Sequence, residues 1–436
     1  MTTSSRRLSA DLTLLRHRPF ALLLFARTAS MLASAFAPVA LAFGVLNLPG
    51  ASATTLSVVL TAEAVPLVVF MLAGGVIADR LPRQRVMMAG ELMNAGAFAA
   101  LGYMLLTEGA PVVAMAAAAA VTGIGMAMLF PALTGIIPEV VPKDRLQTGN
   151  AVLALGANTA RIAGIVASGA AVVWIGGGWA LIGSALLFGA SAALISRIRL
   201  SARARNTSSS VLADLKEGWY EFRSRQWIWV VVAQFSVLVM ALQAAHGVLG
   251  PVVAKAELGG APAWSAILAG EAVGMVIGVL VAMRLRPRRP ILFATLMVFP
   301  AALPYLLLGI SAPLWTVVLA AFGLGVCFEI FGVLWQTTMQ REIPSEALSR
   351  VSSYDALGSM MFGPIGLLIA GPVSIWIGPK PALIGAAVVI VASTLAALTS
   401  PGVRNLLAPD DDRPSDRDAG DDPVAAGRPV EHPVET

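Results

Sequence analysis

Seven ionisable side chains lie within long apolar stretches of the sequence, where a charge is costly. They are Arg27, Glu63, Glu91, Arg161, Glu271, Glu329 and Asp355. A carboxylic acid in apolar surroundings holds a proton more readily than it does in water, so it can load and release one near neutral pH. An arginine there can pair with an acid or hold an anionic group of a ligand. The chemistry that these residues offer is therefore proton movement and the binding of charged groups.

The segments that carry these residues are long enough to cross a lipid bilayer, which takes about 20 residues of helix. Twelve are predicted, at 20–46, 54–78, 86–106, 112–136, 150–174, 179–197, 227–249, 264–284, 291–310, 314–338, 350–374 and 380–399. The composition agrees, because 57% of the residues are hydrophobic and 13% are charged, whereas soluble domains carry about a quarter charged residues. We therefore expect an all-α integral membrane protein.

Basic residues mark alternate loops between these segments. They occur in the N-terminal residues and at 80–85, 143–145, 197–225, 284–289 and 341–350. The other loops contain only Lys255 and Lys380. Because cytoplasmic loops carry the excess of Lys and Arg, both termini are expected in the cytoplasm of a bacterial cell. The same loops explain the isoelectric point of about 9.8, and we expect no nucleic-acid partner.

The chain is expected to divide into five parts. These are a cytoplasmic N-terminus at 1–19, a six-helix bundle at 20–197, a linker at 198–226, a second six-helix bundle at 227–400 and a tail at 401–436. In the linker, apolar residues at helical spacing predict an amphipathic helix on the inner membrane surface. They are Val211, Leu212, Leu215, Trp219 and Phe222. The tail is rich in Asp and Pro, which predicts disorder.

The two bundles repeat each other in sequence. The stretch at 141–156 aligns with that at 343–358, so that Pro142 meets Pro344, and the stretch at 78–85 aligns with that at 282–289. A displacement by six helices preserves orientation in the membrane, so the repeats are parallel. Parallel halves around a site at the middle of the bilayer are typical of secondary transporters.

Two acids occupy related helices of the two repeats. Glu63 precedes Asp79 by about 24 Å of helix and Glu271 precedes Arg284 by about 20 Å, at a rise of 1.5 Å per residue. In the register of the repeat, Glu271 corresponds to position 67, one turn from Glu63 and on a similar face. Both acids could line one central cavity and carry protons. Alternatively, each is a partly wet acid that is hydrogen-bonded to a neighbouring helix.

Arg27 and Arg161 lie at comparable depth, where each could pair with an acid or hold an anionic substrate group. Gln243 shares the seventh segment with Gln234 and His246, and amides and aromatics there could line a site for a bulky amphiphile. We count Arg27, Arg161 and Gln243 with the two acids as a predicted proton and substrate pathway.

Three further acids lie toward the cytoplasmic ends of their segments. Glu91 comes six residues after Arg85, so a structural role is favoured. Glu329 and Asp355 are near the same side, and Asp355 is added to the predicted pathway as a gate residue.

The loop after the second segment reads GGVIADRLPRQR at 74–85. It resembles the motif Gly-x-x-x-Asp-Arg-x-Gly-Arg-x-Arg of the major facilitator superfamily. The matching residues are Gly75, Asp79, Arg80, Arg83 and Arg85, and Pro82 stands in place of the second glycine. The stretches 26–43, 137–152, 211–224 and 348–359 are similar to the efflux branch that includes the enterobactin exporter and macrolide-efflux permeases.

This resemblance implies the major facilitator fold, with twelve transmembrane helices in two parallel six-helix repeats. It also implies that Gly75, Asp79, Arg80, Arg83 and Arg85 form a cytoplasmic latch that holds the outward-open state. Alternatively, Arg83 and Arg85 only set the topology. The family's antiporter signature has Gly-Pro where this chain has Gly164-Ile165, so the fifth helix alone does not imply antiport.

We expect a secondary active transporter that exports a small amphiphilic molecule, such as a drug, a siderophore or a secondary metabolite, by proton antiport. The alternatives are an uptake or facilitated-diffusion carrier of the same fold, and a membrane sensor or assembly protein that transports nothing. We expect no metal site, because Cys327 is the single cysteine and the three histidines are far apart. We also expect no enzyme and no cofactor, because the sequence has no phosphate-binding glycine loop and no nucleophile elbow. The expected partners are the substrate, protons and the lipid bilayer, and the expected form is a monomer in the cell membrane.

Overall fold

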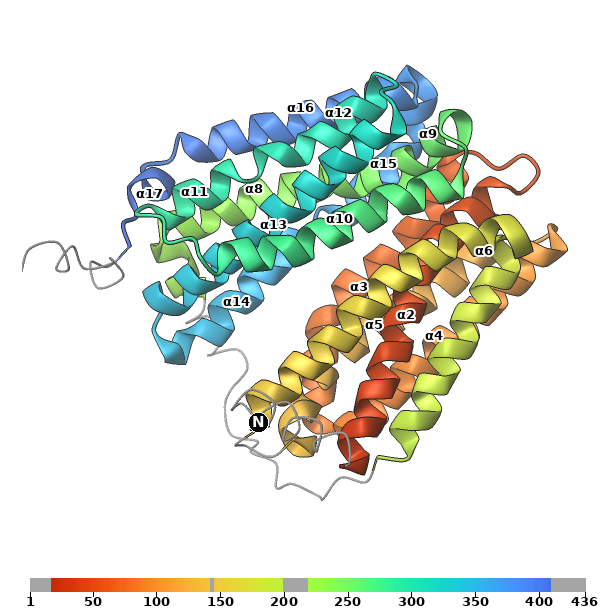
Figure 1. Cartoon of the computed structure of the whole chain (residues 1–436), viewed down its shortest axis with the longest axis horizontal. Coiled ribbons are helices and arrows are strands. Elements are labelled where there is room, and N and C mark those ends of the chain that lie inside the picture. The colour runs from red at the N-terminus through yellow and green to blue at the C-terminus, as the bar shows by residue number, and fades with distance from the viewer. Residues whose placement is uncertain (1–16, 142–144, 199–218, 409–436) are drawn as a thin grey trace, which may run out of the picture.

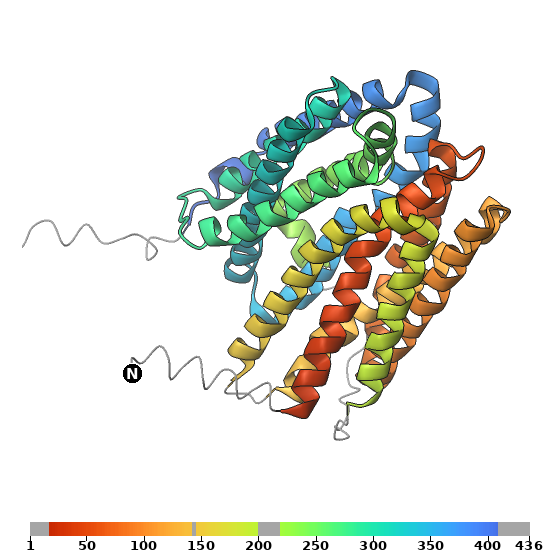
Figure 2. The ribbon, with the colours of Figure 1, turned by 45° about the vertical axis from the view of Figure 1, so that its right-hand side comes forward.

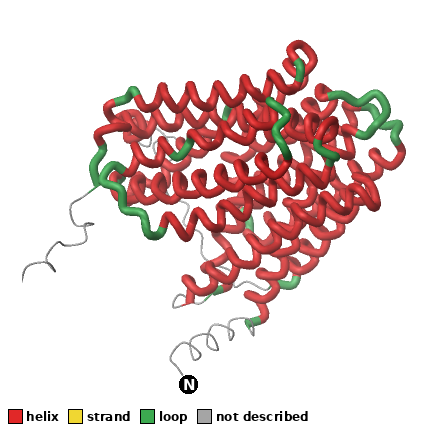
Figure 3. Tube along the Cα trace, turned by 45° about the horizontal axis from the view of Figure 1, so that its top comes forward, coloured by secondary structure: helices red, strands yellow, loops and turns green. Residues whose placement is uncertain are grey.

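The computed structural model describes residues 17–141, 145–198 and 219–408. Within these ranges all regular structure is helical and no β-strand occurs, as Figure 3 shows. The prediction of an all-α protein is confirmed for this part of the chain.

The described residues of the first half form five long helices. They are α2 (Arg18–Leu46), α3 (Ala53–Arg80), α4 (Arg83–Thr107), α5 (Val112–Val140) and α6 (Leu146–Ser196). The last of these bends back on itself at Gly176, whose φ of 80° lies in the left-handed region that glycine enters without a steric penalty. In Figures 1 and 2, α2 (red) lies between the two arms of α6 (yellow and yellow-green), against which it packs.

The second half is more segmented. Its elements are α8 (Gln226–Leu242), η3 (Gln243–Leu249), α9 (Gly250–Glu257), α10 (Ala261–Ala282), α11 (Pro290–Leu296), η4 (Phe299–Ala302), α12 (Leu303–Gly309), α13 (Leu314–Glu342), α14 (Ser345–Met360), α15 (Gly363–Ile377), α16 (Pro379–Leu398) and α17 (Pro401–Asn405). Several breaks fall at prolines, which cannot donate a helical hydrogen bond. A short helical turn at 219–224 precedes α8.

Ten helical stretches of the described residues are long and apolar enough to cross a membrane. One of them, Thr148–Ser196, contains both arms of α6, and α4 is not among the ten. The twelve predicted helices are reached when the two arms are counted separately and α4 is added. Large apolar side chains on the outer surface, such as Trp174 and Trp376, suit contact with lipid at the ends of the helices.

Each half packs mainly on itself. In the first, α3 packs on α5, and α4 packs on α5 and α6; in the second, α10 packs on α13, and α8 packs on α14 and α16. The halves meet through α3 with α15 and through α6 with α10. Figure 1 shows them as two bundles, red to yellow and green to blue.

Candidate functional site

Glu63 and Glu271 occupy matching positions in the two halves. A Cβ atom added to Gly123 of α5 would lie 2.1 Å from the carbonyl oxygen of Glu63, and one added to Gly325 of α13 would lie 2.1 Å from that of Glu271. Only glycine lets two helices approach so closely. The prediction that Glu271 corresponds to position 67 is therefore wrong by one turn, because in the packed helices Glu271 corresponds to Glu63 itself.

The side chain of Glu63 is half-buried and points to its own half of the molecule. It forms a hydrogen bond with the hydroxyl of Thr122 on α5. The same hydroxyl donates to the carbonyl oxygen of Ala119 at 2.7 Å. Because a hydroxyl has one proton, Thr122 in that arrangement can only accept from a protonated Glu63.

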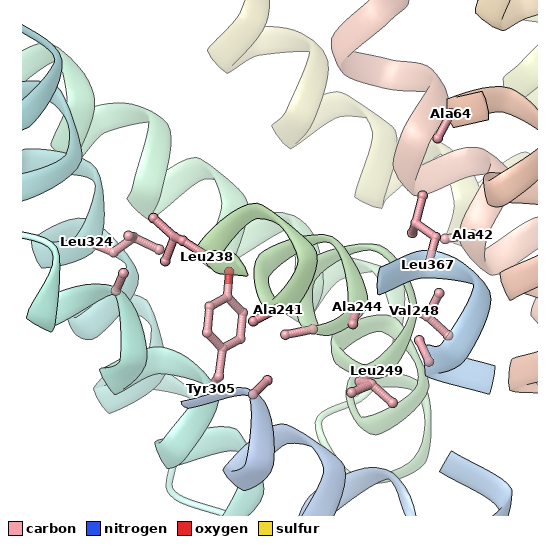
Figure 4. Close-up of a cluster of buried hydrophobic side chains, with 14 of the residues drawn as sticks. Ala42, Ala64, Leu238, Ala241, Ala244, Val248, Leu249, Tyr305, Leu324 and Leu367 are labelled. Atoms are coloured by element: carbon pink, nitrogen blue, oxygen red, sulfur yellow. The ribbon is translucent and has the colours of Figure 1, made fainter. Parts of the chain in front are cut away.

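The side chain of Glu271 belongs to a polar cluster built from three elements. Its Oε2 lies 3.8 Å from Nδ1 of His246 on η3. The same nitrogen lies 3.2 Å from the hydroxyl oxygen of Tyr305 on α12. The ring of Trp264 on α10 meets the imidazole edge-on, with centroids 5.4 Å apart. Figure 4 shows Tyr305 reaching from α12 toward Leu238 and Ala241 of α8.

A π-helical turn, η3, carries His246. It precedes Pro251, which lacks an N–H group and crowds the carbonyl four residues before it. Such turns are frequent at functional sites. Gln243 begins this turn and lies against the start of α15, where a Cβ on Gly363 would be 3.4 Å from its Cγ.

Arg161 connects the two halves. Its Nη2 lies 3.4 Å from the sulfur of Met275 on α10, and its charge acts on Glu329 of α13. Its Nε is buried and has no hydrogen-bond partner. The sequence predicted that Arg161 either pairs with an acid or holds an anionic substrate group, and in the structure its charge acts on the acid Glu329.

Arg27 on α2 also has a buried Nε without a hydrogen-bond partner. One turn further along the helix, Ser30 forms a side-chain hydrogen bond with Glu91 of α4. Glu91 is 2% exposed. It therefore links α4 to α2 within the first half, which suits the structural role that its place in the sequence favoured.

Asp355 on α14 accepts a hydrogen bond from Nε1 of Trp335 on α13 at 3.0 Å. The neighbouring Tyr354 packs against the rings of Trp219 and Phe222, with centroids 5.5 and 5.9 Å apart. The predicted amphipathic helix of the linker lies mostly outside the described residues, but its last two apolar side chains contact α14 here. Asp355 therefore stands where α13, α14 and the end of the linker meet.

The predicted latch lies only partly within the described residues. The backbone of α3 is helical as far as Arg80, but the side chains of Gly75, Asp79 and Arg80 are outside the described part. Next, α4 begins at Arg83, directly after Pro82, and Arg85 is exposed. The role of these residues stays a prediction.

Contacts between the halves gather near the Asn47–Ser52 loop, the bend at Gly176 and the Leu258–Gly260 loop. We call this region the Gly176 end. The hydroxyl of Ser57 on α3 donates to the carbonyl oxygens of Leu367 and Leu368 on α15.

Two more contacts join the halves there. The ammonium group of Lys255 on α9 donates to the carbonyl oxygen of Leu46, at the last turn of α2. A Cβ on Gly371 would lie 2.6 Å from Cα of Thr54. Sequence reasoning missed these contacts because their acceptors are backbone carbonyls, which every residue has. Lys255 stood out only as one of two cations in otherwise uncharged loops.

The sequence is similar to that of known membrane transporters. The model of the Major Facilitator Superfamily matches residues 20–367. The multidrug efflux pump Tap of Mycolicibacterium fortuitum is 26% identical over 385 residues, which cover 82% of this chain and 89% of the relative. Macrolide efflux protein A of Streptococcus pyogenes is 23% identical over 354 residues, with 78% and 85% covered.

Solved structures share the fold at low sequence identity. A crystal structure of the nucleoside transporter NupG superposes with a TM-score of 0.69 and 13% identity, covering 88% of this chain and 98% of that one. A crystal structure of the peptide transporter POT in complex with sulfate gives a TM-score of 0.71 and 14% identity, covering 89% and 96%. These likenesses concern the fold alone.

Proposed function

Because the chain belongs to the Major Facilitator Superfamily, we propose that it is a secondary active transporter that exports a small amphiphilic molecule in exchange for protons. The membership confirms the resemblance carried by the loop at 74–85, and the efflux proteins among its relatives agree with the efflux branch. The cargo is a drug, a siderophore or a secondary metabolite. The proton gradient supplies the energy, and the protein acts as a monomer in the bacterial cell membrane.

The matched positions of Glu63 and Glu271 carry this proposal. Each acid sits where a helix crosses a glycine of its partner helix, α3 over Gly123 and α10 over Gly325. Both α3 and α10 also contact the opposite half of the molecule. A change of charge at either acid therefore acts on helices that form the boundary between the halves.

Glu63 is suited to carry a proton in its neutral form. When Thr122 gives its proton to the Ala119 carbonyl, a protonated Glu63 has an acceptor in the hydroxyl oxygen and an ionised Glu63 does not. Glu271 has a basic partner instead, because the His246 imidazole faces it. The two acids therefore differ in what stabilises their charged and neutral forms.

Alternating access requires two sets of contacts that form in turn. In the present arrangement the Gly176 end is held by Ser57 and Lys255, which donate to carbonyl oxygens across the boundary. At the cytoplasmic end, the family resemblance assigns Asp79 to the latch, where a carboxylate would accept hydrogen bonds from the N-terminal amides of another helix. Exposed ion pairs contribute only about 0–1 kcal/mol each, so a latch of several can still release.

Accumulation of ethidium in cells tests the proposal. Cells that express the chain should retain less dye than cells without it, and a protonophore should remove the difference. Glu63→Gln and Glu271→Gln should each remove most of the difference, because neither amide can carry the proton. Glu257→Gln is the matched control, since Glu257 is held by Lys380 at 2.8 Å at the Gly176 end, away from this pair.

Each other outcome points elsewhere. A difference that survives the protonophore would contradict proton coupling. Greater retention in expressing cells would identify uptake or facilitated diffusion on the same fold. Equal retention for a panel of dyes, drugs and siderophores would favour the sensor or assembly role.

A further inference from the structure

His246 faces two partners through one nitrogen. Its Nδ1 lies 3.2 Å from the Tyr305 hydroxyl oxygen and 3.8 Å from Oε2 of Glu271. A neutral imidazole that keeps its proton on Nε2 accepts from Tyr305 through Nδ1 and offers Glu271 nothing. A protonated imidazole has a hydrogen on Nδ1 and a positive charge, and both favour an ion pair with the Glu271 carboxylate. For the neutral ring with its proton on Nε2, uptake of a second proton at Nδ1 therefore decides whether the Glu271 carboxylate is paired.

The pair remains accessible while its setting is rigid. The side chains of His246 and Glu271 are 35% and 27% exposed. Tyr305 and Trp264 are buried, at 3% exposure each. The imidazole is therefore held by fixed aromatic neighbours, while small ions and ligands can still reach the carboxylate.

We propose that His246 and Glu271 form a proton-controlled binding site for an organic cation. When His246 is neutral, the Glu271 carboxylate is free to bind the cation. When His246 takes up a proton, its imidazolium forms an ion pair with the Glu271 carboxylate and displaces the cation. Proton and cation then exchange at one acid, Glu271. This proposal rests on the proposed antiport and adds that the exported substrate is positively charged.

Among the charged groups on elements that pack against this pair, Arg161 of α6 comes near, with its Nη2 3.4 Å from the sulfur of Met275, one turn along α10 from Glu271. Neither α8 nor α15 carries a titratable side chain, and both pack on η3. From α9, Lys255 donates to the Leu46 carbonyl, and from α16, Lys380 bonds Glu257. From α3, Glu63 bonds Thr122. The groups that face His246 are therefore Glu271 and Tyr305.

The site also lies next to the boundary between the halves. Gly247 follows His246 directly, and a Cβ on it would lie 3.5 Å from Leu60 of α3 and 2.7 Å from Leu367 of α15. Leu367 is the residue whose carbonyl accepts the hydrogen bond from Ser57. A movement of the π-helical turn on proton binding is therefore transmitted to a contact that holds the Gly176 end.

Binding of ethidium to the purified full chain tests the site without any gradient. Fluorescence titration at about pH 6 and about pH 8 brackets the ordinary range of histidine. We expect binding to be about fivefold tighter at the higher pH, the size of effect of one partly exposed ion pair. His246→Gln should bind ethidium equally at both pH values, and Glu271→Gln should bind it weakly at both.

Two controls and one direct titration complete the test. His17→Gln and Glu257→Gln should keep the behaviour of the unaltered chain, because neither residue belongs to the cluster. In a His17→Gln/His432→Gln protein, His246 is the single histidine, and NMR can follow its titration. Its midpoint should move when Glu271→Gln is added and stay when Glu257→Gln is added.

The outcomes separate this site from the proposed antiport. A pH dependence that survives His246→Gln would overturn the site, as would a His246 titration that ignores Glu271→Gln or a failure of the unaltered chain to bind ethidium. Proton-driven export could still hold in all three cases, because the accumulation experiment measures it independently. Conversely, binding with the expected pH dependence but without export would support the site and reject the exporter.

Discussion

Single side chains hold particular helices in register. The indole of Trp335 is 5% exposed, and its N–H group donates to the Asp355 carboxylate at 3.0 Å. The only other hydrogen bond described for that carboxylate comes from the Ser359 hydroxyl of the same helix, at 3.4 Å. Trp335 therefore provides the described link between Asp355 and α13.

Trp335→Phe should destabilise the protein, because it removes the N–H donor and also part of a buried ring that packs on Trp227 and Phe331. A hydrogen bond to a charged group contributes about 1.5–3 kcal/mol. Thermal unfolding in detergent should therefore show a clear fall in the midpoint. Trp376→Phe is the control, since Trp376 is 85% exposed and its loss should change little. Equal midpoints for both variants would refute the role of the Trp335–Asp355 bond.

Pairs of helices approach closely where glycines replace side chains. On α13, Gly325 lies under Glu271 of α10, whereas Gly323 has nothing within 4 Å of the position of its missing Cβ. On α5, Gly123 lies under Glu63 in the same way. The two acids owe their equivalent positions to these glycine crossings.

Gly325→Ala should push α10 away from α13 and weaken transport and stability together. Overpacking of a tight site costs about 1–3 kcal/mol. Gly323→Ala adds the same methyl group to the same helix, and it should be neutral or stabilise by up to about 1 kcal/mol. Unfolding midpoints and ethidium export of the two variants make the comparison. A Gly325→Ala protein as stable and active as Gly323→Ala would show that the crossing tolerates a side chain.

At the scale of the whole molecule, the two halves, which the sequence predicts to be parallel repeats, meet through α3 with α15 and α6 with α10. Parallel repeats require that corresponding loops lie on the same side of the membrane. Arg83, at the start of α4, and Arg288, between α10 and α11, belong to such corresponding loops.

Labelling with a membrane-impermeant thiol reagent checks this topology in a Cys327→Ser background. Arg83→Cys and Arg288→Cys should both be protected in intact cells and both react after permeabilisation. Lys380→Cys, at the Gly176 end, should react in intact cells. Detection of Arg83→Cys and Arg288→Cys on opposite faces of the membrane would contradict the parallel repeat and with it the proposed transport cycle.

The lengths of the apolar segments and the positions of the arginines are properties of the linear sequence, so they could be identified without the structure. They determined where the helices lie and that the two halves correspond. The short motif at 74–85 was enough to indicate the superfamily, and four longer stretches indicated its efflux branch. These features work from sequence because the bilayer imposes the same length and charge rules on every helix.

Only the tertiary structure decided which polar groups meet. The one-turn error for Glu271, the action of Arg161 on Glu329 and the His246–Tyr305 contact all depend on how helices rotate and approach one another. Glycine crossings and carbonyl acceptors set those approaches, and neither has a signature in residue type or spacing. The sequence by itself therefore determined the membrane helices and their repeat, whereas the three-dimensional packing determined the partner of each buried charge, because partners come from helices far apart along the chain.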